Sequence, residues 1–273
     1  MVLGFSPCPN DTFIFDALVH GKIDAEGLRF DWFMEDVESL NRRAMKGDGD
    51  VLKVSYHAWL YLQDNYVLLD SGSALGTGNG PLLIAMKSYS PEELAGMTIA
   101  IPGEYTTAHL LLKLALPGAR LKKILLFSRI EEAILNGEVD AGVIIHENRF
   151  TYQDKGLVKI MDLGEWWEVR TSQPLPLGGI VAKKSLGFET IHRLNRVMRR
   201  SVEQALKDPS GAMPFVRCNA QEMNDEVMMK HIRLYVNEYT VDLGIKGKEA
   251  IRTLVEKFEQ RGYGLTGSVQ RYP

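Results

Sequence analysis

Cysteine is almost absent from this sequence of 273 residues, which contains only Cys8 and Cys218. Two cysteines do not make a disulfide framework, and such low usage is typical of a reducing compartment. No apolar run reaches the about 18 residues that a membrane-spanning helix needs. Acidic and basic residues nearly balance, at a net charge of −3, so the chain lacks the basic surface with which proteins bind nucleic acid or anionic membranes. We therefore expect neither a nucleic acid nor a membrane as a partner.

The sequence also lacks the short motifs that mark several large enzyme classes. It has no Walker phosphate loop, no GxGxxG after a strand, no GxSxG and no HExxH. We therefore expect no nucleotide or redox cofactor and no metal. The N-terminus starts at once with a strand-like run, Val2–Phe5, without the basic and apolar regions of a signal peptide, which predicts a cytoplasmic protein.

One pattern is present twice in related form. LNRRAMKGDGDVLKVS (residues 40–55) and IEEAILNGEVDAGVII (residues 130–145) both predict a helix, then a glycine, an aspartate and an apolar strand. Gly47 and Gly137 are expected to end the two helices, where a left-handed backbone costs glycine least. Asp50 and Asp140 precede the strands. The repetition predicts two equivalent α/β units.

A second duplication supports this division. GPLLIAMKSYS (residues 80–90) and PLGGIVAKKSLG (residues 176–187) are both apolar strands that end in lysine and serine. Lobe I is expected to hold residues 1–85 and a mostly helical part, 182–273, and lobe II residues 86–181. This α/β layout resembles the type II periplasmic-binding-protein fold, which has a ligand cleft between its lobes. The glycine-rich segment 71–80 is predicted to be a loose loop.

The strand ends carry the candidate functional residues. His146 follows the apolar run 141–145, and ligands of open α/β sheets bind beyond the carboxyl ends of the strands. A histidine there suits a general base near neutral pH, although a histidine bonded to backbone would fit the same place. Lys53 is out of place in an apolar strand. It could reach the surface, bind an anionic ligand or pair with a carboxylate.

Two turns before helices are further candidates. In SPCPNDTFIF, Asn10, Asp11 and Thr12 are plausible caps of a helix that starts near Thr12, and this turn could also contact a ligand. Cys8 has no basic neighbour in sequence and is not expected to be a nucleophile.

In IPGEYTTAHLLL, Thr106 or Thr107 is expected to cap a helix that begins at Ala108. Its free N–H groups and positive dipole end suit the carboxylate of a small substrate. The pair Trp166 and Trp167 is predicted to be packing rather than the aromatic wall of a ligand site.

Several longer runs resemble one enzyme family. The runs SPCPNDTFIFDAL, LKVSYHA, GPLLIA, PGEYTTA, AGVIIHENRFTY, LGEWWE, LPLGGI and LYVNEYTVDLG are similar to those of the 1,4-dihydroxy-6-naphthoate synthases, over nearly the whole chain. The resemblance implies a cofactor-independent lyase of the futalosine route to menaquinone. Its substrate would be cyclic dehypoxanthinylfutalosine, a carboxylate, and its products 1,4-dihydroxy-6-naphthoate and dihydroxyacetone.

The family's base matches His146, and its substrate-contact segments match Lys53, Val54 and Ser55 together with Thr106 and Thr107. His57 departs from the small residue expected after Ser55-Tyr56, so its role stays open. The alternatives are the chorismate dehydratase of the same pathway and a non-enzymatic solute-binding protein. The sequence leaves open whether the protein forms a homodimer.

Overall fold

The structure is a computed structural model that describes residues 1–220 and 224–261. The chain divides into two compact units, which are described one at a time. Unit 1 comprises Met1–Gly76 and Pro176–Pro273, and unit 2 comprises Thr77–Leu175.

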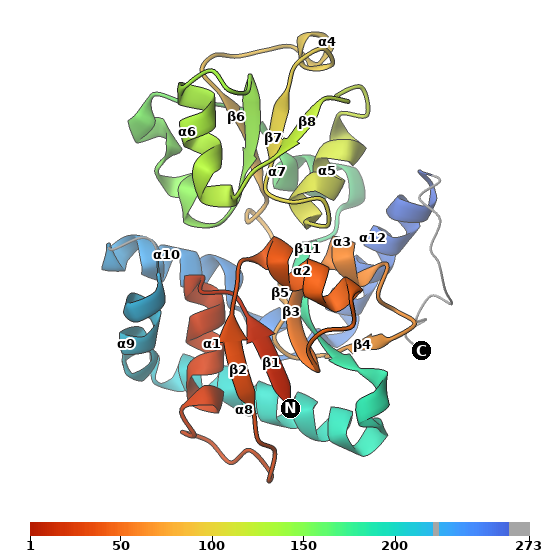
Figure 1. The fold of residues 1–273 in the computed structure, drawn as a ribbon, viewed down its shortest axis with the longest axis vertical. Helices are drawn as coiled ribbons and strands as arrows, with labels where there is room; N and C mark the ends of the chain where they lie inside the picture. Colours follow the sequence, from red (N-terminus) through yellow and green to blue (C-terminus); the bar gives the residue numbers. More distant parts are fainter. Residues whose placement is uncertain (221–223, 262–273) are drawn as a thin grey trace. The chain divides into compact units, whose positions relative to one another are not determined.

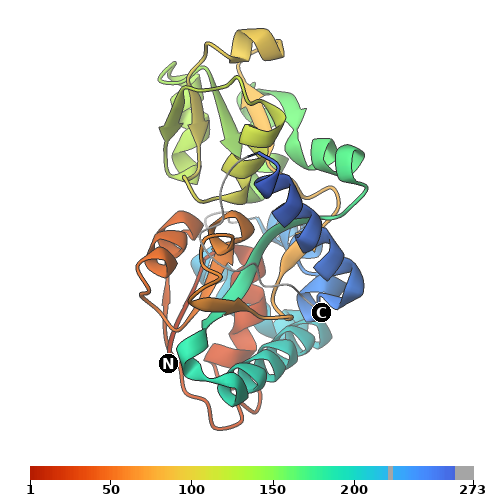
Figure 2. The same ribbon diagram turned by 90° about the vertical axis from the view of Figure 1, so that its right-hand side faces the viewer.

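Unit 1 is built on a mixed sheet. Among its described residues the sheet is six-stranded, with the order β2-β1-β3-β11-β4 and with β5 paired to β11. β1 is parallel to β2 and β3, whereas β11, the long teal arrow in Figure 2, is antiparallel to β3 and β4. The strands are β1 (Val2–Phe5), β2 (Asp31–Met34), β3 (Val51–Ser55), β4 (Tyr66–Leu68), β5 (Ala74–Gly76) and β11 (Leu175–Lys183).

Helices cover this sheet. α1 packs against α8, α9 and α10, as Figure 1 shows, and the apolar core lies between these helices and β1, β3 and β11. The predicted helical C-terminal part is confirmed by α8 to α12. The helices are α1 (Pro9–Val19), α2 (Val37–Met45), α3 (Tyr56–Trp59), α8 (Phe188–Lys207), α9 (Pro209–Asn219), α10 (Asp225–Tyr235), α11 (Glu238–Val241) and α12 (Gly244–Glu259), with a 3-10 turn η4 (Lys184–Leu186) before α8.

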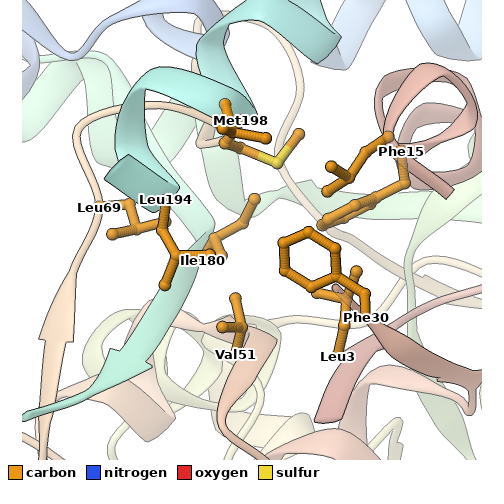
Figure 3. Close-up of a pocket in the computed structure, with 10 residues that line it drawn as sticks. Leu3, Phe15, Phe30, Val51, Leu69, Ile180, Leu194 and Met198 are labelled. Atoms are coloured by element: carbon orange, nitrogen blue, oxygen red, sulfur yellow. The ribbon is translucent and has the colours of Figure 1, made fainter. Parts of the chain in front are cut away.

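A small apolar cavity lies inside the core of unit 1. Figure 3 shows the side chains of Phe15, Ile180 and Met198 pointing toward one another around it, from α1, β11 and α8. Its volume is about 10 Å³ and its lining is apolar, so it has neither the room nor the polar groups to bind a substrate. It is a packing void.

Unit 2 has its own sheet, with the order β10-β6-β9-β7-β8. β7 is parallel to β8 and β9, and β6 is antiparallel to β9 and β10. The strands are β6 (Leu82–Ala85), β7 (Ile99–Ile101), β8 (Lys122–Ile124), β9 (Ala141–Ile144) and β10 (Val158–Asp162). The helices are α4 (Pro91–Leu94), α5 (Thr107–Ala115), α6 (Ile130–Leu135) and α7 (Leu163–Thr171), with 3-10 turns η1 (Phe127–Arg129), η2 (His146–Phe150) and η3 (Tyr152–Lys155).

The predicted duplication is confirmed by the topology. Written from the other end, the second sheet is β8-β7-β9-β6-β10, which matches β2-β1-β3-β11-β4 strand for strand, in direction as well as order. Asp50 accepts a hydrogen bond from Val2 N at 2.8 Å, and Asp140 accepts one from Thr98 N at 2.8 Å. The repeated aspartate therefore ties the start of β3 or β9 to the neighbouring parallel strand. The repeated glycine is left-handed in both units, with φ 70° at Gly47 and 69° at Gly137.

The unit boundaries differ from the predicted ones. β6 was expected in lobe I but pairs with β9 and β10 in unit 2, and most of β11 was expected in lobe II but pairs with β3 and β4 in unit 1. Each duplicated strand completes the sheet of the other half of the chain, because the chain crosses over before it. Residues 221–223 and 262–273 of the predicted lobe I lie outside the described residues.

The segment 71–80 is not the loose loop that its glycines predicted. It contains β5, and Ser71, Ser73 and Asn79 are buried. Gly72 has a left-handed backbone, φ 91°, and a Cβ there would lie 2.1 Å from the side chain of Ile180. Glycine is present because the backbone packs directly on β11.

Candidate functional site

The turn after β1 leads into α1 earlier than predicted. α1 begins at Pro9, with Cys8 as an N-cap whose side chain makes no capping bond. Proline suits the first helical position because its missing N–H has no partner there in any case. Asn10, Asp11 and Thr12 are therefore in the first turn of α1, and the prediction that they cap a helix starting near Thr12 is wrong.

Asp11 is instead the centre of a buried polar cluster. Its carboxylate is 3% exposed and accepts hydrogen bonds from Ser6 Oγ at 2.7 Å, Ser6 N at 3.3 Å and Asn10 Nδ2 at 2.9 Å. Lys53 Nζ lies 3.2 Å from Asp11 Oδ1 and donates to Gly72 O at 2.8 Å. Lys53 is therefore paired with a carboxylate and does not reach the surface, and its contact with an anionic ligand stays a prediction. A buried charge needs such a partner, because its desolvation is otherwise uncompensated.

His231 of α10 extends the cluster. Its Nε2 lies 2.9 Å from Asn10 Oδ1, and both side chains are buried. Since the Asn10 oxygen can only accept, the Nε2–H of His231 donates. The two residues are 221 positions apart in the chain, so no local sequence pattern points to this contact.

Val54 and Ser55 end β3 in unit 1. Val54 is 1% exposed and pairs with Gly179 of β11. Ser55 N donates to Asn41 Oδ1 at 2.9 Å, and Ser55 Oγ accepts from Asn41 Nδ2 at 3.2 Å. Asn41 of α2 was not a candidate, although it fixes the strand end that carries one.

In unit 2 the turn after β7 leads into α5. Thr106 is the N-cap, with Oγ1 accepting from His109 N at 3.3 Å and donating to Gly103 O at 2.9 Å. This confirms one of the two predicted caps, but the helix begins one residue earlier than predicted, at Thr107, which is 3% exposed. His109 Nδ1–H donates to Glu104 O at 2.8 Å. Burial lowers the pKa of His109 to about 4, so the ring is neutral at pH 7.

His146 follows β9, as predicted, and its backbone is left-handed. Its φ is 60°, a conformation that a side chain with a Cβ rarely adopts. The residue is half-buried, and its ring lies edge-on to Phe127, with ring centroids 5.0 Å apart. Left-handed non-glycine residues gather at functional sites, where the surrounding structure holds them in place.

Arg149 anchors the turn that His146 begins. Its guanidinium donates to Gly80 O at 2.8 Å and to Asp162 Oδ2 at 3.3 Å, and Asp162 is the N-cap of α7. Gly80 meets Gly164 so closely that a Cβ on Gly80 would lie 2.2 Å from the Gly164 Cα. η2 is thus attached to a closely packed part of unit 2.

The candidates of each unit lie at one edge of its sheet. β1 and β3 are adjacent and parallel, so their carboxyl ends lie at the same edge of the sheet. Asp11 lies in the helix that follows β1, and Ser55 is the last residue of β3. β7 and β9 are likewise adjacent and parallel, which gives the start of α5 and His146 the same relation. Ligands of open α/β sheets bind at this edge.

His57, Trp166 and Trp167 pack against neighbouring side chains. His57 is 2% exposed and its ring packs near Tyr61 and Phe258 of α12, at centroid distances of 5.7 and 6.0 Å. Trp167 is 1% exposed and donates to Pro174 O, which agrees with the predicted packing role. Trp166 is half-buried, with Arg170 over its ring.

The described ranges, 1–220 and 224–261, lack two features. No three histidine, cysteine, aspartate or glutamate side chains are grouped there as a metal site requires. None of the helices in those ranges has the length and apolar character needed to cross a membrane.

Comparison with known proteins identifies the family. A family model described as menaquinone biosynthesis matches residues 1–260. The chain is 46% identical over 260 residues to a 1,4-dihydroxy-6-naphthoate synthase of Thermus thermophilus, covering 95% of this chain and 94% of the relative. It is 44% identical over 265 residues to the enzyme of the same name from Streptomyces coelicolor, covering 95% and 93%.

Solved structures agree on the fold. A protein from Archaeoglobus fulgidus superposes with a TM-score of 0.91 at 36% identity, over 96% of this chain and 98% of that one. The alkanesulfonate-binding protein of Xanthomonas axonopodis pv. citri gives 0.69 at 14% identity, over 98% and 94%. A Candida albicans protein with the generic periplasmic-binding-protein fold gives 0.64 at 11%, over 95% and 94%. The predicted fold class is therefore confirmed, and the chain belongs to the menaquinone biosynthesis family that its sequence resembles.

Proposed function

We propose that this protein is a carbon–carbon lyase that converts cyclic dehypoxanthinylfutalosine to 1,4-dihydroxy-6-naphthoate and dihydroxyacetone. The support is the identity of 46% and 44%, over nearly full length, to two enzymes with the corresponding name. Aromatisation of the second ring supplies the driving force, so the protein has to bind the substrate, orient it and move a proton.

His146 is proposed as the general base. The observation that supports this role is its left-handed backbone, φ 60°, at the carboxyl end of β9. Such a conformation is costly, by about 1–3 kcal/mol, and strain of this kind is a pointer to function. The neutral imidazole would take a proton from the sugar-derived part of the substrate, and carbon–carbon cleavage would follow.

The substrate carboxylate is proposed to bind at the start of α5. Thr107 is the first helical residue there, and the positive end of the helix dipole favours a carboxylate. Buried hydrogen bonds to a carboxylate are shorter and stronger than those between neutral groups. Lys53, Val54 and Ser55, with the neighbouring Asn10 and Asp11, are proposed as the substrate-binding residues of unit 1.

A product assay tests the proposed reaction. The purified protein is incubated with cyclic dehypoxanthinylfutalosine and, separately, with chorismate, and products are separated and identified by mass. We expect 1,4-dihydroxy-6-naphthoate and dihydroxyacetone in equal amounts from the first substrate and no dehydration of the second. The His146→Asn protein, prepared in the same way, controls for contaminating enzymes. Turnover of chorismate alone would replace the proposal with the dehydratase activity.

A further inference from the structure

A buried carboxylate lies directly beneath the turn that His146 begins. Glu131, in the first turn of α6, is 2% exposed. Its Oε2 accepts hydrogen bonds from Asn148 Nδ2 and, at 2.7 Å, from Lys155 Nζ. Among the described residues its other oxygen, Oε1, is buried and has no hydrogen-bond partner. Asn148 and Lys155 therefore contact the same oxygen of the Glu131 side chain.

The two donors belong to the segment that holds His146. Asn148 lies two positions after His146 in η2, and Lys155 closes η3. Because both bind the same oxygen, η2 and η3 are fastened at one point on α6. A buried carboxylate without these donors would be unfavourable, so the contact resists opening.

The ring of His146 rests on the same part of the chain. Its edge-on neighbour Phe127 is in η1, which runs directly into α6. The segment from Phe127 to Glu131 thus supports both the imidazole and the backbone that follows it. Support of this kind is what a left-handed histidine needs, because the conformation persists only where its surroundings impose it.

We propose that Glu131 is a positioning residue for His146, which it acts on through Asn148 and Lys155 without touching the substrate. The inference rests on the proposed function, in which His146 is the base. A base has to be held near its productive geometry, and a displacement of about 1 Å can lower the rate about 100-fold. Glu131 holds that geometry from the side of α6, and Arg149 holds the same turn at Gly80 and Asp162.

The first test compares turnover with binding. Glu131→Gln keeps an acceptor oxygen but removes the charge that attracts Lys155, and we expect kcat to fall about 10- to 100-fold. The affinity for the product 1,4-dihydroxy-6-naphthoate, measured by calorimetry, should stay at the wild-type value. A rise of KM with unchanged kcat would overturn the proposal, because it would indicate a binding role.

A matched control is available in unit 1. Asp16 is also a buried carboxylate, 4% exposed, and it holds Lys22 and His20. Asp16→Asn should lower the thermal unfolding temperature as Glu131→Gln does, but leave kcat unchanged. Equal loss of kcat in both variants would reduce Glu131 to a general contributor to stability and overturn the proposal.

A double variant separates this inference from the proposed function. If Glu131 acts through His146, Glu131→Gln should cause no further loss of kcat in the His146→Asn background. Full additive loss would overturn the inference alone, and so would wild-type turnover of Glu131→Gln beside an impaired His146→Asn. Wild-type turnover of His146→Asn would overturn the proposed function itself.

A second variant covers failure of Glu131→Gln to fold. Asn148 is only half-buried, so Asn148→Ala removes one of the two ties with less risk to the core. It should lower kcat in the same direction by a smaller factor, and again show no added loss in the His146→Asn background. An unchanged kcat in folded Asn148→Ala would overturn the proposal.

Discussion

β3 and β9 occupy equivalent places in two sheets of the same strand order, yet the chain continues differently after each. Their registers with β1 and β7 align Val51 with Ala141, and hence Lys53 with Val143 and Tyr56 with His146. Tyr56 begins the helix α3, is fully buried, and bonds to Ser73 Oγ at 2.8 Å. His146 begins a 3-10 turn, is half-buried and has a left-handed backbone.

The comparison shows which features the two units share and which belong to only one of them. The shared parts are the helix-ending glycine, the aspartate that ties two strands and the strand that crosses from the other half of the chain. The parts that differ begin at the last strand residue. Unit 1 uses its strand end to bury a charge pair and an aromatic side chain, whereas unit 2 uses the same place to hold a strained histidine.

His146→Asn should have the largest effect, and it tests whether the difference between the two strand ends is functional. Asparagine tolerates the left-handed backbone, so the variant should fold. A positioned general base contributes about 10²–10⁴-fold, and kcat should fall by that factor. The pH profile of kcat/KM should also lose the ionisation of a histidine, while product affinity stays near the wild-type value.

The equivalent position in unit 1 provides the control for that variant. Tyr56→Phe removes the hydroxyl that bonds to Ser73 and should lower the free energy of unfolding by about 1 kcal/mol. Its turnover should match the wild type. Normal turnover in a folded His146→Asn protein, or a large loss in Tyr56→Phe, would remove the functional distinction between the strand ends.

Lys53→Met should give the largest loss of stability. It places an apolar side chain where unit 2 has Val143, but it leaves the buried Asp11 carboxylate without its cation. Removing one member of a buried ion pair costs about 3–5 kcal/mol. Urea unfolding without ligand measures this cost. Adding Asp11→Asn should restore part of it, and no restoration would mean that the pair is not what stabilises the strand end.

Sequence patterns predicted this molecule well where the signal is local. The Gly-x-x-Asp spacing predicted β3 and β9. Lys53 was unusual as a lysine inside an apolar strand, and His146 was unusual as a histidine directly after one. The patterns did not predict which sheet β6 and β11 join, because the sequence of an apolar strand does not specify the strand with which it pairs. They also missed His231, Asn41 and Glu131. A glutamate in a first turn, such as Glu131, looks like an ordinary charge favoured by the helix dipole until burial is known.

The third residues of α1 and α5 also differ, and this difference affects how the stability of the protein depends on pH. Asp11 in α1 and His109 in α5 both bond back to the turn before their helix, but His109 is held neutral, with its pKa lowered by burial to about 4 from 6.5. Between these values the unfolded chain binds a proton that the folded protein excludes. The stabilisation is therefore complete above about pH 6.5 and is lost as pH falls toward about 4.

The lowered pKa corresponds to at most about 3 kcal/mol. Urea unfolding of the wild type and of His109→Leu at a series of pH values measures it. The variant should show a smaller decrease in stability between neutral and acidic pH. Identical pH dependence of the two proteins would mean that another group is responsible.

Thr107→Val tests whether the start of α5 binds an anion. The start of α1 differs, so we expect no equivalent anion site there. Loss of a hydrogen bond to a charged group should weaken substrate binding by about 1–3 kcal/mol. Thr106→Val is the matched control, because it removes the N-cap and should lower stability by about 1 kcal/mol with a smaller effect on binding. Unchanged substrate affinity in Thr107→Val would place the carboxylate elsewhere.

The smallest effect tests the shared scaffold itself. Asp50→Ala and Asp140→Ala each remove the carboxylate that accepts from the backbone N–H of the neighbouring strand, Val2 in unit 1 and Thr98 in unit 2. Both bonds lie at the surface, so each loss should be about 1 kcal/mol in the free energy of unfolding. Asp50 also has Lys183 at 3.7 Å, but a half-buried pair this long adds little. Urea unfolding should give nearly equal losses that add in the double variant, because the two sites lie in different units. A loss confined to one variant would show that the repeated aspartate stabilises only one of the two sheets. The two units would then share their strand order but not the stabilising effect of this residue.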